Sequence, residues 1–409
     1  MSNKKITTLG LTIWFICAFF YALEYFVRSS TGALLDEFMK APYNLTIASI
    51  SFFSSAFFWS YIAAHIPAGI IIDKIGVKKS MIVSTAIFSA AMFIATIARS
   101  EFMLIIYRIL AGFGGGFSML CAVKAINIWL PNRLFSSFMG MTQFILYVGA
   151  TLSAAPLVFL SKYISISKIM ALIFIISFIL LLLTIFVIKT HPDYKQKYKT
   201  NNEIKNKKDL PKILSILKNK QVWLNGLYCF TIYGTTVIFA DLLGVRYLSL
   251  YGFSENQAGI CASLIFVGVF IFSPTWGFLA SILNREKILL LVAPIFGFFI
   301  VIYLLYFNHN IFIAYILCVI FGGIQAVHVL NFSIVRSFIP ADKIATILAF
   351  INIFIPLSGG VLQPIAGSMI TYLKQSYSPI HAFQITLIII PVLMTISAII
   401  AIFIKESKK

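Results

Sequence analysis

Gly69-Ile-Ile-Ile-Asp73-Lys74-Ile-Gly76-Val-Lys78-Lys79 is a short polar and basic stretch that separates two long apolar runs. Each flanking run is long enough to cross the hydrocarbon core of a bilayer as a helix, which takes about 20 residues. Apolar runs of this length recur along the whole chain, which is 60% apolar and only 11% charged. A soluble domain carries about 25% charged residues. The sequence therefore predicts an all-α protein that crosses the membrane many times.

We expect twelve spans with approximate limits 6–34, 46–72, 79–98, 102–128, 136–160, 165–188, 222–250, 256–282, 287–306, 310–334, 343–372 and 381–404. The first run is too long for the core of a cleaved signal, so we expect it to be retained as a helix. All five cysteines lie inside apolar runs and form no metal-type pair. We therefore expect no disulfide, no metal site and no cofactor.

The positive charges of the chain alternate from loop to loop. Of the 32 Lys and Arg residues, 23 lie at the two termini and in alternate loops, whereas five lie in the intervening loops. This asymmetry follows the positive-inside rule and predicts cytoplasmic termini and an even number of spans. Membrane topology thus accounts for the net charge of +19, and we expect no nucleic-acid partner. The expected location is the inner membrane, as a multi-pass protein and a monomer.

A Lys- and Asn-rich segment divides the chain into two halves. We expect an N-terminal six-helix bundle over 1–188, a basic cytoplasmic linker over 189–221 and a C-terminal six-helix bundle over 222–409. Four features occur in the same order in both halves: a charged pair, a proline–glycine helix end, a glycine cluster, and an amide followed by glycine. Such a repeat predicts a duplicated bundle with a substrate site between the halves.

The stretch quoted first resembles the signature loop of the major facilitator superfamily, Gly-x-x-x-Asp-Arg/Lys-x-Gly-x-Arg/Lys-Arg/Lys. Together with the twelve spans and the two related halves, the resemblance covers nearly the whole chain. It implies two pseudo-symmetric six-helix bundles that work by alternating access. It also implies a conformational latch on the cytoplasmic side, made of Gly69, Asp73, Lys74, Gly76, Lys78 and Lys79. In this latch we expect Gly69 to allow a close contact between helices.

Arg108-Ile-Leu-Ala-Gly112-Phe-Gly114-Gly-Gly116 resembles the Arg-x-x-x-Gly-x-Gly segment of the family's fourth helix. Glycines spaced in this way allow neighbouring backbones to pack closely. For Arg108 we consider a structural or gating ion pair, coupling to protons, or a side chain that snorkels to the surface. In the eleventh run, Gly359, Gly360 and Pro364 could break or bend the helix or form a packed kink.

Two pairs of opposite charges lie inside the first and seventh runs: Glu24 with Arg28, and Asp241 with Arg246. Charges within lipid-spanning segments cost roughly 2.5–3.5 kcal/mol each on insertion scales, so they usually face a bundle interior or an aqueous path. The alternative is two ion pairs at the membrane rim. Because Glu24 and Asp241 are the only acids that we place within the spans, they are the candidate proton carriers.

Further side chains in the predicted cavity are candidates for substrate binding or proton coupling. Lys124 either snorkels to the surface or serves as a cavity cation that receives a carboxylate or balances Glu24. The amides could instead join helices by hydrogen bonds, and the histidine could serve in packing or could titrate. These candidates are Tyr21, Tyr25, Lys124, Asn127, Gln143, Tyr233, His328, Asn352 and Gln363.

The segments that contain Arg28, Lys124 and Asp241 resemble bacterial branches that include phagosomal nutrient transporters and carriers of organic anions. This resemblance implies proton-coupled uptake of amino acids or of a similar small carboxylate-bearing nutrient. Transport of a polycarboxylate siderophore or organic anion is an alternative, and drug/proton antiport is another. The fifth run lacks the Gly-Pro pattern of antiporters. The chain has no nucleotide-binding motif and no catalytic cluster, so we expect neither an ATP-driven pump nor an enzyme.

Overall fold

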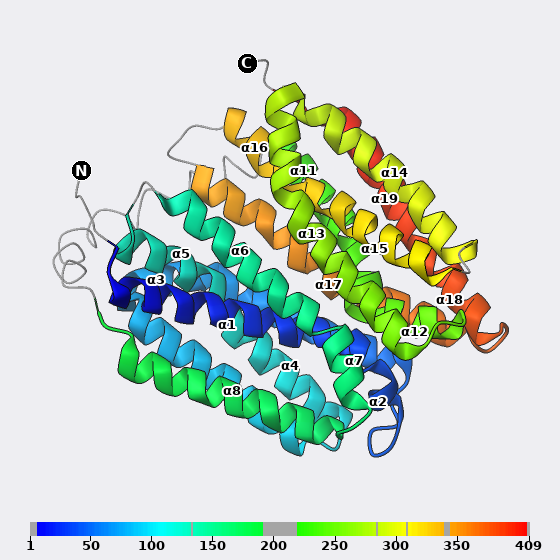
Figure 1. Cartoon of the computed structure of the whole chain (residues 1–409), viewed down its shortest axis with the longest axis horizontal. Helices are drawn as coiled ribbons and strands as arrows, with labels where there is room; N and C mark the ends of the chain where they lie inside the picture. Colours follow the sequence, from blue (N-terminus) through cyan, green and yellow to red (C-terminus); the bar gives the residue numbers. More distant parts are fainter. Residues whose placement is uncertain are drawn as a thin grey trace.

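The computed structural model describes residues 6–131, 134–190, 219–283, 285–307, 310–338 and 344–406, and every regular element within them is helical (Figure 1). Twelve helical segments of this part are long and apolar enough to cross a membrane. The predicted fold class and number of spans are therefore confirmed. The predicted linker, 189–221, lies almost entirely outside the described residues.

The helices of the first half are α1 (Thr8–Ala33), α2 (Leu35–Met39), α3 (Ile47–Ile97), α4 (Glu101–Gly115), α5 (Ser118–Trp129), α6 (Phe135–Leu152), α7 (Ala155–Ser161) and α8 (Ile166–Val187). The second and third predicted spans are both part of α3, and the break between them is confined to Gly76. Its backbone has φ 84° and ψ 165°, a conformation that is easy only for glycine. The short loop expected between these spans is therefore a one-residue break.

The elements of the second half are α11 (Lys220–Ile238), the π-helical turn η2 (Phe239–Leu243), α12 (Gly244–Leu250), α13 (Glu255–Leu283), α14 (Glu286–Tyr306), α15 (Ile311–Gln325), the 3-10 turn η3 (Ala326–His328), α16 (Val329–Phe338), α17 (Ile344–Leu373), α18 (Pro379–Leu387) and α19 (Ile389–Phe403). The seventh and tenth spans are thus interrupted by η2 and η3. By contrast α17 is a continuous helix that contains Pro356 and Pro364, so the helix break considered for the eleventh span is absent.

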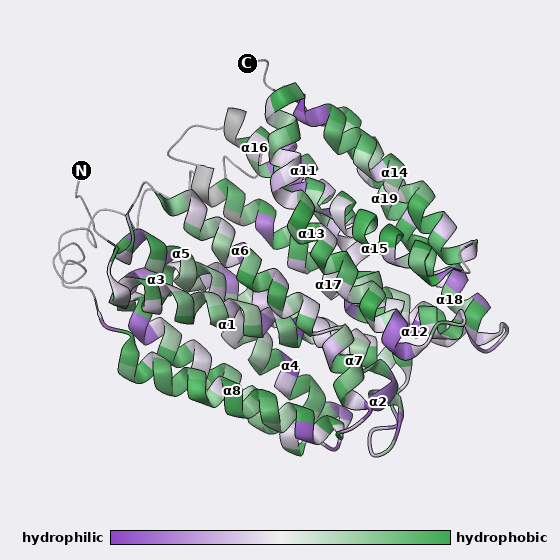
Figure 2. Cartoon of the chain, in the orientation of Figure 1, coloured by the Kyte–Doolittle hydropathy of each residue, from purple (hydrophilic) through white to green (hydrophobic). Residues whose placement is uncertain are grey.

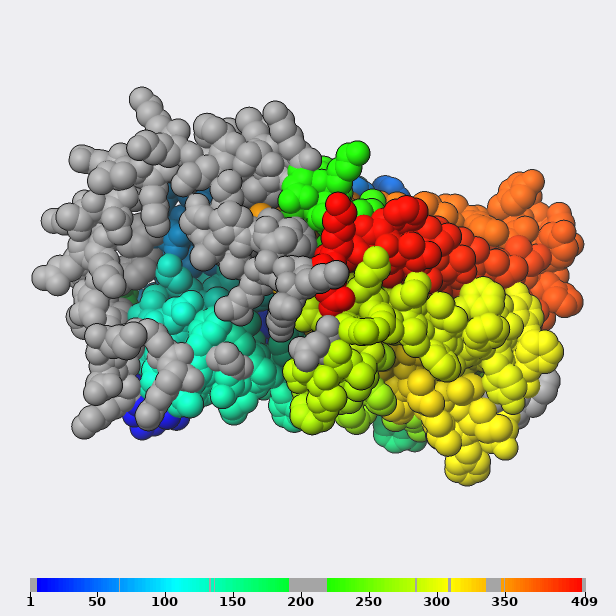
Figure 3. Space-filling model, turned by 90° about the horizontal axis from the view of Figure 1, so that it is seen from above, coloured from blue at the N-terminus to red at the C-terminus, as the bar shows by residue number. Residues whose placement is uncertain are grey.

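The two halves lie on opposite sides of the molecule, as the space-filling view shows (Figure 3). Between them α17 packs along α3, α13 packs on α6 and α7, and α1 packs on η2. The helices α1 and η2 therefore lie at the centre, where they position the candidate site.

The start of α1 and the end of α19 lie at the same end of the bundle, and α2 and α12 lie at the opposite end (Figure 1). We call these the cytoplasmic end and the outer end, after the orientation predicted from the loop charges. Hydrophobic residues cover the sides of α8 and α14, whereas hydrophilic residues gather around α2 and α12 (Figure 2). This distribution suits a protein whose sides face lipid and whose ends face water.

Candidate functional site

Four charged side chains are almost completely buried in the middle of the protein. Glu24 and Arg28 lie on α1, Arg108 lies on α4, and Asp241 lies in η2; their exposed fractions are 0%, 5%, 0% and 0%. Two acids and two bases make this set formally neutral. Charged groups are buried at such a cost that they are usually paired or functional, so this cluster is the candidate site.

Arg28 connects the two halves through a pair of tyrosines. Its Nη2 donates a hydrogen bond to the hydroxyl of Tyr233 at 2.9 Å, and its guanidinium lies 3.6 Å from the ring centroid of Tyr25. The hydroxyls of Tyr25 and Tyr233 also share a hydrogen bond. Three of the predicted site residues, from α1 and α11, are therefore in direct contact across the interface between the halves.

Arg108 is fully buried and ties α4 to α1. Its Nη1 donates to the carbonyl of Val27 at 2.9 Å, and its Nη2 donates to the hydroxyl of Thr31. Aromatic rings of α3 and α4 surround the guanidinium. The snorkelling interpretation of Arg108 is therefore wrong, because the side chain points into the bundle and is closed off from the surface.

Asp241 faces the first half, and it does not pair with Arg246 as expected. Its carboxyl group interacts electrostatically with Arg28 and Arg108 and has Ser29 beside it. Arg246 instead forms an ion pair with Asp36 at 2.9 Å. Asp241 lies in the π-helical turn η2 and Arg246 lies in α12, and their side chains point to different neighbours.

Glu24 packs against α4, and its carboxyl group is completely buried. A Cβ atom added to Gly115 would lie 2.4 Å from the Cγ of Glu24, so the absence of a side chain at Gly115 provides the space for this acid. Within the described residues, neither carboxylate oxygen of Glu24 has a hydrogen-bond partner. Arg28, one turn further along α1, is the cation that acts on it electrostatically. The rim interpretation of this pair is wrong, since both side chains are buried.

Lys124 and Asn127 do not reach this cluster. The Nζ of Lys124 forms an ion pair with Asp73 at 2.6 Å, which ties α5 to α3 near Gly76, at the cytoplasmic end. Asn127 is exposed at the same end. The hypothesis that Lys124 balances Glu24 is therefore wrong in this conformation, and Lys124 instead belongs with the latch residue Asp73.

The remaining latch residues and glycines have different surroundings. In the described part of the chain, no atom lies within 4 Å of the position of a Cβ on Gly69, so the close contact expected there is absent. Lys74 and Lys79 are exposed and Lys78 is partly exposed. The glycines at the end of α4 pack closely on α3. A Cβ on Gly112 would lie 2.2 Å from an α3 carbonyl oxygen, one on Gly114 would lie 2.8 Å from another α3 carbonyl oxygen, and one on Gly116 would lie 2.8 Å from an α3 side chain.

The second half contributes a polar group around η3. The Nδ1 of His328 lies 2.7 Å from the carbonyl oxygen of Gln325, and the His328 ring contacts the Tyr233 ring edge-on at 5.9 Å between centroids. Gln325 is completely buried, and among the described residues its side-chain oxygen and nitrogen have no hydrogen-bond partner. Sequence reasoning missed Gln325, although a glutamine in the middle of an apolar span was a visible signal.

The other predicted residues are spread around the cluster. Tyr21 is buried on α1, and Gln363 donates from Nε2 to the carbonyl of Val237 at 3.3 Å. Gln143 and Asn352 are half-buried. Gly359 and Gly360 face the rings of Phe58 and Trp59, and Pro364 lies within continuous α17. The structure therefore brings Tyr25, Arg28, Tyr233, Asp241 and His328 together in one cluster. The predicted amides lie outside this cluster, in contacts between helices or partly exposed.

The arrangement offers binding groups and exchangeable protons, and it offers no metal site. No group of three His, Cys, Asp or Glu residues in the described part of the chain could hold a metal ion. The five cysteines are free and buried. The cluster presents a guanidinium and phenol hydroxyls to an anion, and carboxylates to a proton or an ammonium group.

Comparisons with known proteins agree with this architecture. A family model, Major Facilitator Superfamily, matches residues 15–254 and 242–409. An uncharacterized transporter of Bacillus subtilis (strain 168), YybO, is 24% identical over 411 residues, which cover 91% of this chain and 90% of that protein. A probable sulfoacetate transporter of Cupriavidus necator, SauU, is 24% identical over 151 residues, which cover 37% of this chain and 35% of that protein. A solved nucleoside transporter, NupG, has the same fold, with a TM-score of 0.77, 14% identity, and coverage of 98% of this chain and 100% of that one.

Proposed function

The chain belongs to the major facilitator superfamily and is a secondary transporter of a small molecule; from this premise we propose that it takes up an amino acid, or a similar small carboxylate-bearing nutrient, together with protons. The proposal places the protein in the inner membrane, with the cytoplasmic termini that the loop charges predict. The observation that carries it is the fully buried carboxyl group of Glu24, without a hydrogen-bond partner in the described residues, one turn from Arg28.

Glu24 is the proposed proton carrier. A buried carboxylate without hydrogen bonds is costly, so it either takes up a proton or receives a cationic group. A transporter that alternates between its two faces can use this property, because the cost changes when the site becomes exposed to water. The carboxylate oxygens of Asp241 also lack hydrogen-bond partners among the described residues, but two cations, Arg28 and Arg108, act on this acid, whereas Arg28 alone acts on Glu24.

Arg28 is the proposed partner of the substrate carboxylate. Its guanidinium has one nitrogen on the Tyr233 hydroxyl, and its Nε has no hydrogen-bond partner among the described residues. A planar guanidinium binds a carboxylate with two parallel hydrogen bonds. Because Glu24 lies on the same helix, α1 can offer a cation to the carboxylate and an anion to the ammonium group of a zwitterion.

Transport of an organic anion is the second candidate. The relative from Cupriavidus necator is named for sulfoacetate, a small anion, and the arginines alone would suffice to bind such a substrate. A polycarboxylate would have to bind without Lys124, because that side chain is held by Asp73 at the cytoplasmic end. Drug/proton antiport gains no support from the buried cluster, which is small and charged.

Uptake by proteoliposomes tests the proposal. Purified protein receives a panel of amino acids under an imposed pH gradient, acid outside, with citrate and sulfoacetate as competitors. We expect an amino acid to accumulate, and we expect Glu24→Gln to abolish accumulation against a gradient while exchange at equilibrium continues. Glu37→Gln, which removes a carboxylate of α2 that is 27% exposed, is paired with Lys40 and lies in a different helix from the buried cluster, is the control. If only the organic anions compete, the second candidate replaces the first; if Glu24→Gln still concentrates the substrate, Glu24 is not the proton carrier.

A further inference from the structure

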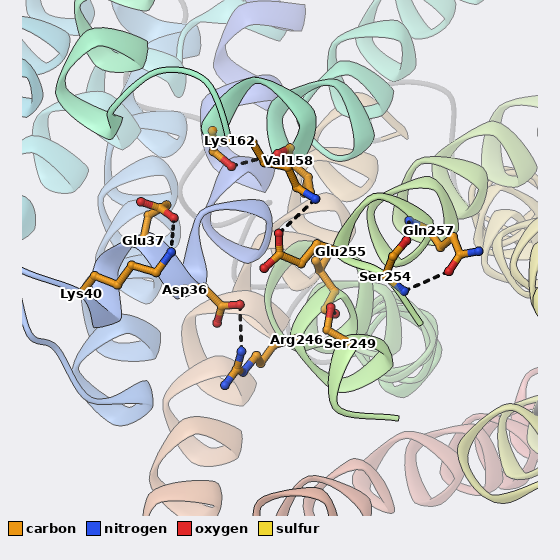
Figure 4. A network of polar contacts seen from close by, with 12 residues as sticks. Asp36, Glu37, Lys40, Val158, Lys162, Arg246, Ser249, Ser254, Glu255 and Gln257 are labelled. Carbon is orange, nitrogen blue, oxygen red and sulfur yellow. Dashed lines mark hydrogen bonds and ion pairs between the residues drawn. The ribbon is translucent and has the colours of Figure 1, made fainter. Parts of the chain in front are cut away.

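Two ion pairs join the halves at the outer end (Figure 4). The Oδ2 atom of Asp36 on α2 lies 2.9 Å from Nη1 of Arg246 on α12. The Nζ atom of Lys162, which follows α7, lies 3.3 Å from Oε2 of Glu255 at the start of α13. Each pair contains one residue from each half, so neither pair can persist if the outer ends of the halves separate.

The two pairs have opposite polarity. The first half supplies the acid in one pair and the base in the other. Asp36 also interacts electrostatically with Glu255, so a displaced register that brought the two acids together would meet repulsion. Crossed charges of this kind select a single closed arrangement. Lys162 and Glu255 are 37% and 51% exposed, so the partly buried Asp36–Arg246 pair contributes more to this selection.

The backbone beneath these pairs is also closely packed. A Cβ on Gly32 of α1 would lie 2.8 Å from the carbonyl oxygen of Asp241 in η2. Ser263 on α13 accepts a hydrogen bond from the amide of Ala155 at 2.9 Å and donates one to the carbonyl of Thr151 at 2.8 Å. Ser263 thus bridges the break between α6 and α7, and the outer end is closed by contacts of several kinds.

We propose that Asp36–Arg246 and Lys162–Glu255 form an outer gate, which closes the path from the outside in this conformation and must separate before the outer end opens. The proposal rests on the transport function, because only a transporter needs to open this end. It depends neither on the identity of the substrate nor on the coupled ion. A third ion pair serves as a control for these two. It joins Glu37 of α2 to Lys40, the residue that follows α2, at 2.6 Å, and both residues belong to the first half.

The burial of the Asp36–Arg246 pair determines which substitution opens the gate. The side chains of Asp36 and Arg246 are only 27% and 31% exposed. Burial raises the pKa of Asp36, and Arg246 acts in the opposite direction, as does Lys40, whereas Glu255 raises it further. Removing Arg246 therefore leaves a half-buried carboxylate with too little compensating positive charge. This destabilises the closed conformation more than removing both partners does.

Distance measurements between spin labels test the gate without any substrate. The labels are placed at Lys168→Cys and Ser376→Cys, which are exposed residues of the first and second halves at the outer end. The five native cysteines are buried, so labelling favours the introduced pair. The variants are Arg246→Gln, Asp36→Asn, the double variant and Glu37→Gln, all in lipid nanodiscs.

At neutral pH we expect Arg246→Gln to raise the ratio of open to closed molecules about tenfold, on the scale of an uncompensated charge that is partly exposed. Asp36→Asn should raise it less than about threefold, and the double variant should return most of the way to the parent. Glu37→Gln should leave the ratio unchanged. The gate proposal would be refuted if the double variant had the same ratio of open to closed molecules as Arg246→Gln alone. It would also be refuted if Arg246→Gln had the same ratio as Glu37→Gln.

The pH dependence gives a second readout. In Arg246→Gln the carboxyl of Asp36 is harder to ionise in the closed state than in the open state, where water surrounds it, so the closed state binds its proton more tightly. Acidification should therefore close this variant again. The groups that face Asp36 are Arg246, Glu255, Lys40 and Lys374, and in the variant the last two are the remaining cations. An open fraction of Arg246→Gln that does not fall on acidification would contradict the assigned role of Asp36.

Discussion

Replacing Gly32 by alanine should force the outer end open. Gly32 lies near the end of α1, where a Cβ atom would lie 2.8 Å from the carbonyl oxygen of Asp241 and 2.9 Å from that of Leu242. Both obstacles are backbone atoms of η2, so they cannot rotate away. An ordinary contact begins at 3.4 Å, and α1 and η2 would therefore have to move apart by several tenths of an ångström.

The magnitude follows from the fact that only one conformation contains the clash. Overpacking of this kind costs about 1–3 kcal/mol. Alanine also favours the helix by up to about 1 kcal/mol over glycine, but this gain is the same in the open and closed states and cancels. The ratio of open to closed molecules should therefore rise about 5- to 150-fold.

The assay is the distance between labels at positions 168 and 376, compared with the parent and with Gly140→Ala. Gly140 lies on α6, and among the described residues no atom is within 4 Å of its Cβ position, so this variant carries the same change in helix propensity without the clash. A distance distribution for Gly32→Ala that equals that of Gly140→Ala would show that the contact of α1 with η2 does not hold the outer end closed.

Three further substitutions test other contacts. Arg108→Lys loses the two-pronged bonding of α4 to α1, and we expect the melting temperature of the purified protein to fall, by the equivalent of about 1.5–3 kcal/mol in unfolding free energy. Gly115→Ala places a Cβ 2.4 Å from Cγ of Glu24, so proton-driven uptake should fall at least about tenfold while the protein still folds, as judged by gel filtration. Ser263→Ala leaves the amide of Ala155 without its partner at the interface of the halves and removes one of the hydrogen bonds to the carbonyl of Thr151, so the label distances should show more of the open state.

The number of spans could be read from the sequence because it depends on composition and length alone. A run of about 20 apolar residues has few alternatives to a membrane helix. The burial of Glu24 and Arg28 was also within reach, since the cost of a charge in lipid directs it into the bundle. Both inferences use only the local sequence, and neither needs to know which helices touch.

The partners of the charges were beyond such reasoning, as Arg246 and Lys124 show. Arg246 was assigned to Asp241 by proximity in sequence, and its actual partner, Asp36, lies 210 residues away. Lys124 was considered as a partner of Glu24, and it binds Asp73 on another helix. A side chain at the end of a long flexible stem finds its partner through the packing of helices, which a single sequence does not specify.

The positions of the two charge clusters suggest how events in the membrane reach the outer end. Asp241 and Arg246 belong to one continuous piece of helix, η2 followed by α12, and Arg28 and Asp36 belong to α1 and the α2 helix that directly follows it. The same two segments therefore face each other twice, once through buried charges and once through the outer gate. Because Gly32 holds their backbones in contact between these points, a displacement of η2 from α1 acts on both clusters together. A proton or a substrate that alters the balance among Glu24, Arg28 and Asp241 consequently has a short mechanical path to the gate, made of two short helical segments and one close contact.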